Sequence, residues 1–238
     1  MSGLSGLVVA ALVACLSSCS VLDRSGASDD ASGTPSSTST ATSQPLVDSQ
    51  FTRDGTFQSH ISADGVKGID FVYTLYPTKS TPRTNEWFPR GSKYFSFTFQ
   101  AYDLSQKIRA PFATKRKVYL QTMKVTSNTI TVDGGKTQHP YRLEALAKDV
   151  TFDPEPLTLR QSMLISSPKG AFELRNQRIA PTSLKTRGLE LSFTAVVFVQ
   201  AKVGGSAYVR RVIKQTVPIQ IFESDKPTEV SSIPVDAN

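Results

Sequence analysis

From Ser49 onward, apolar and polar residues alternate over short stretches of the chain. The clearest stretch is Lys93–Tyr102. Its Phe95, Phe97 and Phe99 fall on one face of an extended strand, which predicts that this face lies in a core. Runs rich in Val, Ile, Thr, Phe and Tyr predict six further strands, over Ile69–Tyr76, Lys117–Val125, Asn128–Val132, Leu157–Ser166, Leu189–Val203 and Ala207–Phe222.

Two glycine-containing turns favour antiparallel pairing of these strands. Val203–Ser206 separates the last two strands, and Asp133–Lys136 follows Asn128–Val132; their glycines can adopt the positive φ angles of tight turns. Pro218 has no amide hydrogen for a ladder, so the last strand is expected at a sheet edge or with a bulge. A two-residue Gly204–Gly205 turn leaves neither face of the last hairpin cleanly apolar, so its register stays open.

Only Tyr141–Lys148 has a helical pattern, long enough for one or two turns between strands. At least seven short strands, without alternating helices, predict an all-β chain. The leading arrangement is an antiparallel β-sandwich, immunoglobulin-like in architecture, and the alternative is an antiparallel barrel. The Cys…Trp…Cys pattern of antibody-type domains does not occur in the sequence.

The first residues of the chain have a different pattern. The apolar run Leu7–Leu16 is ten residues long. As a helix it would cover roughly 15 Å, about half of a hydrocarbon core, so it is too short to span a membrane. The small residues Ser17 and Ser18 follow it, and residues 1–18 are therefore predicted to be a signal peptide.

The stretch Leu16-Ser17-Ser18-Cys19 resembles the lipobox of bacterial lipoproteins. In that family the cysteine thiol receives a diacylglycerol, the preceding peptide is removed, and the new N-terminal cysteine is usually acylated again. The resemblance implies an exported protein held in a bacterial membrane by acyl chains on Cys19. Cys15 also fits the pattern and remains the alternative. Ser20, rather than Asp, follows Cys19, which in this family favours the outer membrane where the cell has two.

Composition divides the remainder of the chain. Up to residue 48 the sequence has long Ser/Thr/Ala/Gly runs and no aromatic residue, so residues 19–48 are predicted to be the lipidated cysteine and a disordered tether. A flexible coil of this length has a root-mean-square reach on the order of 30 Å. Residues 49–222 are expected to form the folded domain, and residues 223–238 an acidic, flexible tail.

The formal net charge of +7 is unevenly distributed. Residues 20–48 and residues 223–238 each carry one basic residue against four acidic ones. Residues 49–222 carry 25 Lys and Arg against 12 Asp and Glu, a net charge of +13. A field of this sign attracts anionic glycans, lipid headgroups or acidic proteins. Nucleic acid is not favoured as a partner, because an exported, membrane-tethered protein rarely meets it and the sequence has no RNP-like or helix-turn-helix pattern.

Two basic clusters are candidate binding residues: Lys115, Arg116 and Lys117, and the pair Arg210 and Arg211. Strand alternation places the members of the pair on opposite faces. In the alternative interpretation, these residues form a basic, solvated surface that binds no ligand.

The loop Pro77–Lys93 supplies three further candidates, Trp87, Phe88 and Arg90. Trp and Arg are enriched at binding hot spots, and loops on a rigid sandwich often carry recognition. In the alternative interpretation, Trp87 and Phe88 fold back and close one end of the sandwich.

Catalytic and metal-binding patterns are weak. His60 and His139 are far apart in sequence, and no set of residues has the spacing of a metal site, so no metal or cofactor is predicted. Ser166–Lys169 formally matches the Ser-x-x-Lys pattern of penicillin-recognising enzymes, but it ends a predicted strand instead of opening a helix. No catalytic residue is assigned.

These observations favour a non-enzymatic, lipid-anchored cell-envelope protein. Its basic β-sandwich is expected to bind a macromolecule, either a protein or an anionic glycan or lipid. The alternatives are a structural subunit of an envelope secretion or assembly complex, and an envelope hydrolase with an unrecognised site.

Overall fold

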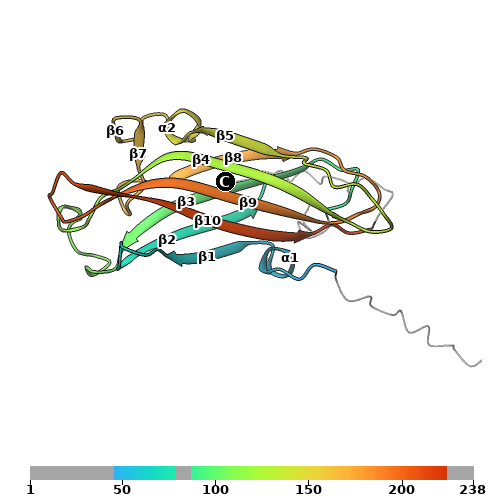
Figure 1. Ribbon diagram of the computed structural model, residues 1–238, viewed down its shortest axis with the longest axis horizontal. Coiled ribbons are helices and arrows are strands. Elements are labelled where there is room, and N and C mark those ends of the chain that lie inside the picture. The colour runs from blue at the N-terminus through green and yellow to red at the C-terminus, as the bar shows by residue number, and fades with distance from the viewer. Residues whose placement is uncertain (1–45, 79–86, 224–238) are drawn as a thin grey trace, which may run out of the picture. The chain divides into compact units, whose positions relative to one another are not determined.

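The computed structural model describes residues 46–78 and 87–223. The predicted signal peptide, Cys19, nearly all of the predicted tether and all but the first residue of the acidic tail lie outside the described residues. The described chain folds into two antiparallel sheets that pack face to face (Figure 1). The predicted all-β sandwich is therefore confirmed, whereas the immunoglobulin-like arrangement stays a prediction.

The first sheet has the strand order β1-β2-β3-β8. Its strands are β1 (Phe57–Ser62), β2 (Ile69–Pro77), β3 (Lys93–Asp103) and β8 (Phe172–Ile179). The short helix α1 (Gln50–Asp54) precedes the sheet. The Ser49 side chain caps α1 by accepting a hydrogen bond from the Thr52 amide.

The second sheet has the strand order β10-β9-β4-β7-β6, and β5 also pairs with β4. Its strands are β4 (Val118–Thr131), β5 (Arg142–Leu146), β6 (Thr158–Leu159), β7 (Ser162–Leu164), β9 (Thr186–Gln200) and β10 (Tyr208–Gln220). A 3-10 turn, η1 (Phe112–Thr114), precedes β4, and the single-turn helix α2 (Ala147–Val150) follows β5.

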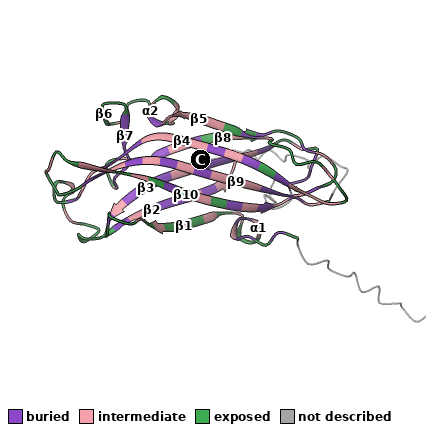
Figure 2. Ribbon diagram, viewed as in Figure 1, coloured by how far each residue is buried: buried purple, intermediate pink, exposed green. Residues whose placement is uncertain are grey.

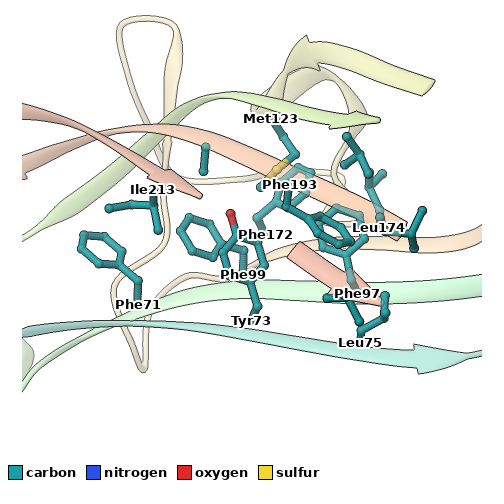
Figure 3. Close-up of a cluster of buried hydrophobic side chains, with 14 of the residues drawn as sticks. Phe71, Tyr73, Leu75, Phe97, Phe99, Met123, Phe172, Leu174, Phe193 and Ile213 are labelled. Carbon is teal, nitrogen blue, oxygen red and sulfur yellow. The ribbon is translucent and has the colours of Figure 1, made fainter. Parts of the chain in front are cut away.

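The core lies between the sheets and is rich in aromatic rings. Phe95, Phe97 and Phe99 are each at most 1% exposed, as their alternation predicts. Figure 2 shows the buried positions concentrated on the strands of both sheets. In Figure 3, Tyr73 and Phe99 from the first sheet lie against Phe193 from the second; the rings of Tyr73 and Phe99 are 4.3 Å apart between centroids.

The segment after β7 joins the two sheets. The Ile165 amide donates to the Val118 carbonyl of the second sheet (2.9 Å), and the Ile165 carbonyl accepts from the Ala101 amide of the first sheet (2.8 Å). The Ser166 hydroxyl accepts from the Val118 amide at 2.6 Å. These bonds fix one edge of the sandwich.

Several predicted elements need correction. The helix predicted over Tyr141–Lys148 is wrong for most of its length, because residues 142–146 form β5 and pair with β4; only Ala147 and Lys148 are helical, in α2. The helix-forming residues of this stretch are overridden by that pairing and by the packing of Leu143 against the core. The strands predicted over Lys117–Val125 and Asn128–Val132 are one continuous strand, β4, and Leu157–Ser166 holds only the short strands β6 and β7.

The last hairpin has a longer loop than two glycines. Tyr208 pairs with Gln200, and the Ala201 amide donates to the Ala207 carbonyl at 2.9 Å, which leaves five residues in the loop. This shifts the register by one residue from that of a two-residue turn and places Ile213 in the core. The strand β10 is a sheet edge, as Pro218 predicts.

The folded domain begins before the expected boundary at Ser49. Val47 is buried, and its Cγ2 would lie 2.6 Å from a Cβ placed on Gly188 of β9. The glycine thus makes room for Val47 on the second sheet, and Val47 belongs to the domain.

Candidate functional site

The two aromatic residues of the Pro77–Lys93 loop belong to the core. Trp87 and Phe88 are only 5% and 4% exposed. The Trp87 ring packs on Phe51 of α1, with centroids 5.3 Å apart, and its carbonyl accepts from the Phe222 amide at 2.7 Å. They close the end of the sandwich beside α1, as the alternative interpretation has it. Of the three candidates in this loop only Arg90 is exposed.

The cluster Lys115–Lys117 does not form a patch of exposed charge. Lys115 is 6% exposed, and its Nζ donates to the Ile108 carbonyl at 2.6 Å. Arg116 and Lys117 are half-buried, and the Lys117 amide donates to Oε1 of Gln200 at 3.1 Å. The burial of Lys115 and the bonds of Arg116 give this cluster a structural role, so the hypothesis of one binding patch needs correction.

Arg116 forms a buried ion pair with Asp103 at the end of β3. Its Nη2 lies 2.8 Å from Oδ1 of Asp103, and its amide donates to Oδ2, also at 2.8 Å. Burial alone would raise the pKa of Asp103, but hydrogen bonds from Arg116 and from the Ser105 side chain lower that pKa to about 2. The carboxylate is therefore ionised at neutral pH, and its bonds to Arg116 join the two ends of the loop between β3 and β4.

Arg210 and Arg211 lie on opposite faces of β10. The Arg211 side chain turns toward the first sheet, where its Nε donates to the Asp64 carbonyl at 2.5 Å. Arg210 is exposed and pairs in register with Phe198 of β9, so its side chain lies on the outer face of the second sheet. Only Arg210 of this pair has an exposed side chain on that face.

A groove on the outer face of the second sheet lies next to Arg210. It has a volume of about 860 Å³. Strands β4, β9 and β10 supply three aromatic side chains to it, and the β6–β7 hairpin supplies a second wall. The lining residues are Tyr119, Gln121, Leu159, Arg160, Gln161, Ser162, Phe198, Ser206 and Tyr208.

The aromatic side chains give this groove an apolar floor with polar edges. The rings of Tyr119 and Tyr208 meet edge to face, with centroids 5.8 Å apart. Burial, and then the neighbouring Tyr208, raise the pKa of Tyr119, so its hydroxyl stays protonated. Arg160 turns the β6–β7 hairpin with a φ of 54°. The described lining residues include no carboxylate.

The sequence interpretation missed this groove except for its neighbour Arg210. Tyr119, Phe198 and Tyr208 come from three strands that only the sheet brings together. One signal was present in the sequence. Every second residue of β9 from Leu189 to Val199 is apolar and faces the core. Phe198 lies on the other face of the strand, with Glu190 and Ser192, and a large apolar side chain on that outward face is unusual.

The residues considered for catalysis are each engaged separately. His60 Nδ1 lies 2.6 Å from Oδ2 of Asp70, and His139 Nδ1 lies 2.9 Å from the Ser127 carbonyl oxygen. The Ser166 hydroxyl is bound to a backbone amide, as described above. In the described ranges, no group of three or more His, Cys, Asp or Glu side chains is placed to hold a metal ion.

Comparison with known proteins assigns no family. No protein-family model matches the chain, and no curated protein sequence matches it significantly. Among residues 46–78 and 87–223, no helix is both long enough and apolar enough to cross a membrane.

Proposed function

We propose that this chain is a lipid-anchored binding protein of the bacterial cell envelope, and that the groove on the second sheet holds an anionic glycan. The anchor is the acylated Cys19, in the outer membrane where the cell has two. The observation that carries the proposal is the groove itself, in which three aromatic rings lie beside two amide side chains and Arg160.

The chemistry of the groove suits a sugar chain. An aromatic ring offers an apolar surface to the C–H face of a sugar ring, and the hydroxyl of tyrosine can bond to its polar edge. Gln121 and Gln161 add amide donors and acceptors for sugar hydroxyls. A concave site with an aromatic floor and a few convergent polar groups is the usual form of a ligand site.

Charge favours an acidic glycan over a neutral one. Arg160 lines the groove, Arg210 lies beside it, and the lining residues include no carboxylate. The net charge of +13 on residues 49–222 draws anionic polymers toward the domain. Guanidinium groups are suited to carboxylate and phosphate groups, because their fork of donors matches two oxygens.

Binding to immobilised polysaccharides tests the proposal. The chain beginning at Ser20 is titrated with lipopolysaccharide, lipoteichoic acid and dextran sulfate, with neutral dextran as the control. We expect binding to at least one of the anionic polymers, and a loss of about tenfold in Tyr208→Ala and in Arg210→Glu. Lys136→Glu is the matched control, because Lys136 is exposed but lies in the turn after β4, away from the groove. Equal losses in the control and the groove variants would contradict the proposal.

A further inference from the structure

Three loops meet at the end of the sandwich opposite α1. They are residues 63–68 between β1 and β2, residues 104–117 between β3 and β4, and residues 201–207 between β9 and β10. Figure 1 shows the turn between β9 and β10 at one end of the strands and α1 at the other. We call the surface of these three loops the loop end.

Hydrogen bonds hold the three loops to one another. Arg116 Nη2 donates to the Lys67 carbonyl at 2.8 Å, which joins the first loop to the second. Gln200, at the end of β9, joins the second to the third: its Oε1 accepts from the Lys117 amide, and its Nε2 donates to the Gly205 carbonyl at 2.6 Å. The basic residues predicted as a binding patch thus form the framework of this surface.

Three large apolar side chains project from this framework. Ile108 is 72% exposed, Leu104 is 61% exposed and Val203 is 44% exposed. The Lys115 ammonium group fixes the backbone at Ile108 by bonding to its carbonyl, while the Ile108 side chain stays in solvent. A single exposed Leu or Ile needs no explanation, but three on adjoining, interconnected loops indicate a contact surface.

Exposed basic residues stand beside two of the three apolar side chains. Lys107 and Arg109 stand on either side of Ile108, Lys202 precedes Val203, and all three are exposed. Of the seven Lys and Arg residues in the three loops, Lys67, Lys107, Arg109 and Lys202 are exposed, against one exposed acidic residue, Asp64. The loop end therefore combines exposed apolar side chains with a net positive charge.

We propose that the loop end binds the surface of an anionic lipid bilayer. Apolar side chains on protruding loops can enter the boundary between headgroups and acyl chains, while the long side chains of Lys and Arg remain with the phosphates. The proposal goes beyond the glycan site, because it concerns the exposed tips of the loops, which share only Ser206 with the groove lining, and a contact that needs no acyl chain on Cys19.

Co-sedimentation with lipid vesicles tests the proposal. The chain beginning at Ser20 contains every described residue and no acyl group. We expect it to bind vesicles of phosphatidylcholine with one third phosphatidylglycerol, and to bind vesicles of phosphatidylcholine alone about tenfold more weakly. Replacing both Leu104 and Ile108 by Ser should weaken binding to the anionic vesicles about tenfold. Lys107→Glu with Arg109→Glu should do the same.

Matched controls lie away from the loop end. Leu184→Ser changes a side chain that is 46% exposed, and Lys136→Glu changes an exposed basic residue. Both should leave vesicle binding unchanged, and all variants should keep the thermal unfolding midpoint because the altered side chains are exposed. Tyr208→Ala should also bind vesicles normally, which separates this proposal from the glycan site.

Three results would overturn the proposal: no binding to anionic vesicles, equal losses in the controls, or loop-end variants that bind anionic vesicles as well as the wild-type chain does.

Discussion

Tyr73 carries a buried hydroxyl in the centre of the core. It is 2% exposed, and its hydroxyl has no hydrogen-bond partner among the described residues. Because an unpaired buried polar group is costly, we expect Tyr73→Phe to raise the free energy of unfolding by about 1 kcal/mol. Tyr141→Phe is the control: its hydroxyl donates to Gln177 at 2.7 Å, so this change should lower the free energy of unfolding. Chemical denaturation measures both, and equal losses would show that the Tyr73 hydroxyl is paired.

Lys93 makes stability depend on pH above neutrality. It is 3% exposed, its Nζ donates to the carbonyls of Pro89 and Gly91, and burial lowers its pKa from 10.5 to about 8. Between pH 8 and 10 the unfolded chain binds more protons at this site than the folded chain. The free energy of unfolding should therefore rise by about 2 kcal/mol from pH 7 to 10.

Lys93→Met should remove this rise in the free energy of unfolding, because methionine has a long unbranched side chain but no ionisable group. Denaturation curves of both proteins at intervals of pH provide the test. The window ends near pH 10, because burial raises the pKa values of Tyr73 and Tyr141 and these residues reverse the trend above it. The same slope in both proteins would contradict the assignment to Lys93.

The loop from β3 to β4 depends on one ion pair. Asp103 accepts from the side chain and the amide of Arg116, and Asp103→Asn would leave a largely buried guanidinium without its counter-charge. We expect a loss of about 3 kcal/mol in the free energy of unfolding. Amide hydrogen exchange should become faster across residues 104–117. Unchanged exchange there would show that the loop is held by other contacts.

The ion pair between Asp103 and Arg116 leads to a second prediction, on the stability of the chain at acid pH. Because the pKa of Asp103 is about 2 in the folded chain and 3.8 ordinarily, its contribution is present above pH 4 and is lost as pH falls toward 2. Acid titration of the wild-type chain should show a loss of about 2 kcal/mol over this interval that Asp103→Asn does not show.

The strands that could be predicted from sequence are those with the strongest alternation. The three phenylalanines of β3 and the inward residues of β9 identify buried faces without reference to a partner. The edge strands β1 and β8 were missed, because both mix polar residues into short stretches. Tyr141–Lys148 was predicted as a helix because its residues have a clear helical preference, but pairing with β4 decides its structure.

The candidate site was less predictable than the fold. Basic residues adjacent in sequence indicated a patch at Lys115–Lys117, but sequence carries no information on which charges become buried in pairs. Tyr119 and Tyr208 are distant in sequence and meet only through the order β10-β9-β4. A groove of this kind depends on sheet order and hairpin register, and the register of the last hairpin could not be derived from its glycines.

In the molecule as a whole, two adjoining surfaces, which share Ser206, lie on one basic domain. The groove lies on the outer face of the second sheet, and the loop end lies opposite α1, where the described chain begins. Both involve long-range attraction by positive charge, so raising the salt concentration should weaken polysaccharide binding and vesicle binding alike. Substitutions distinguish the two surfaces. Tyr208→Ala should weaken polysaccharide binding, whereas replacing Leu104 and Ile108 by Ser should weaken vesicle binding.

The most direct test of the central claim is photo-cross-linking in intact cells through a photo-reactive phenylalanine derivative at position 208. We expect an adduct with a broad gel mobility, as for a glycan, which periodate oxidation removes and in which no second protein is found. The same group at position 136 should give no adduct. A sharp adduct with a single protein from position 208 would contradict the glycan assignment and would favour a subunit of an envelope complex instead.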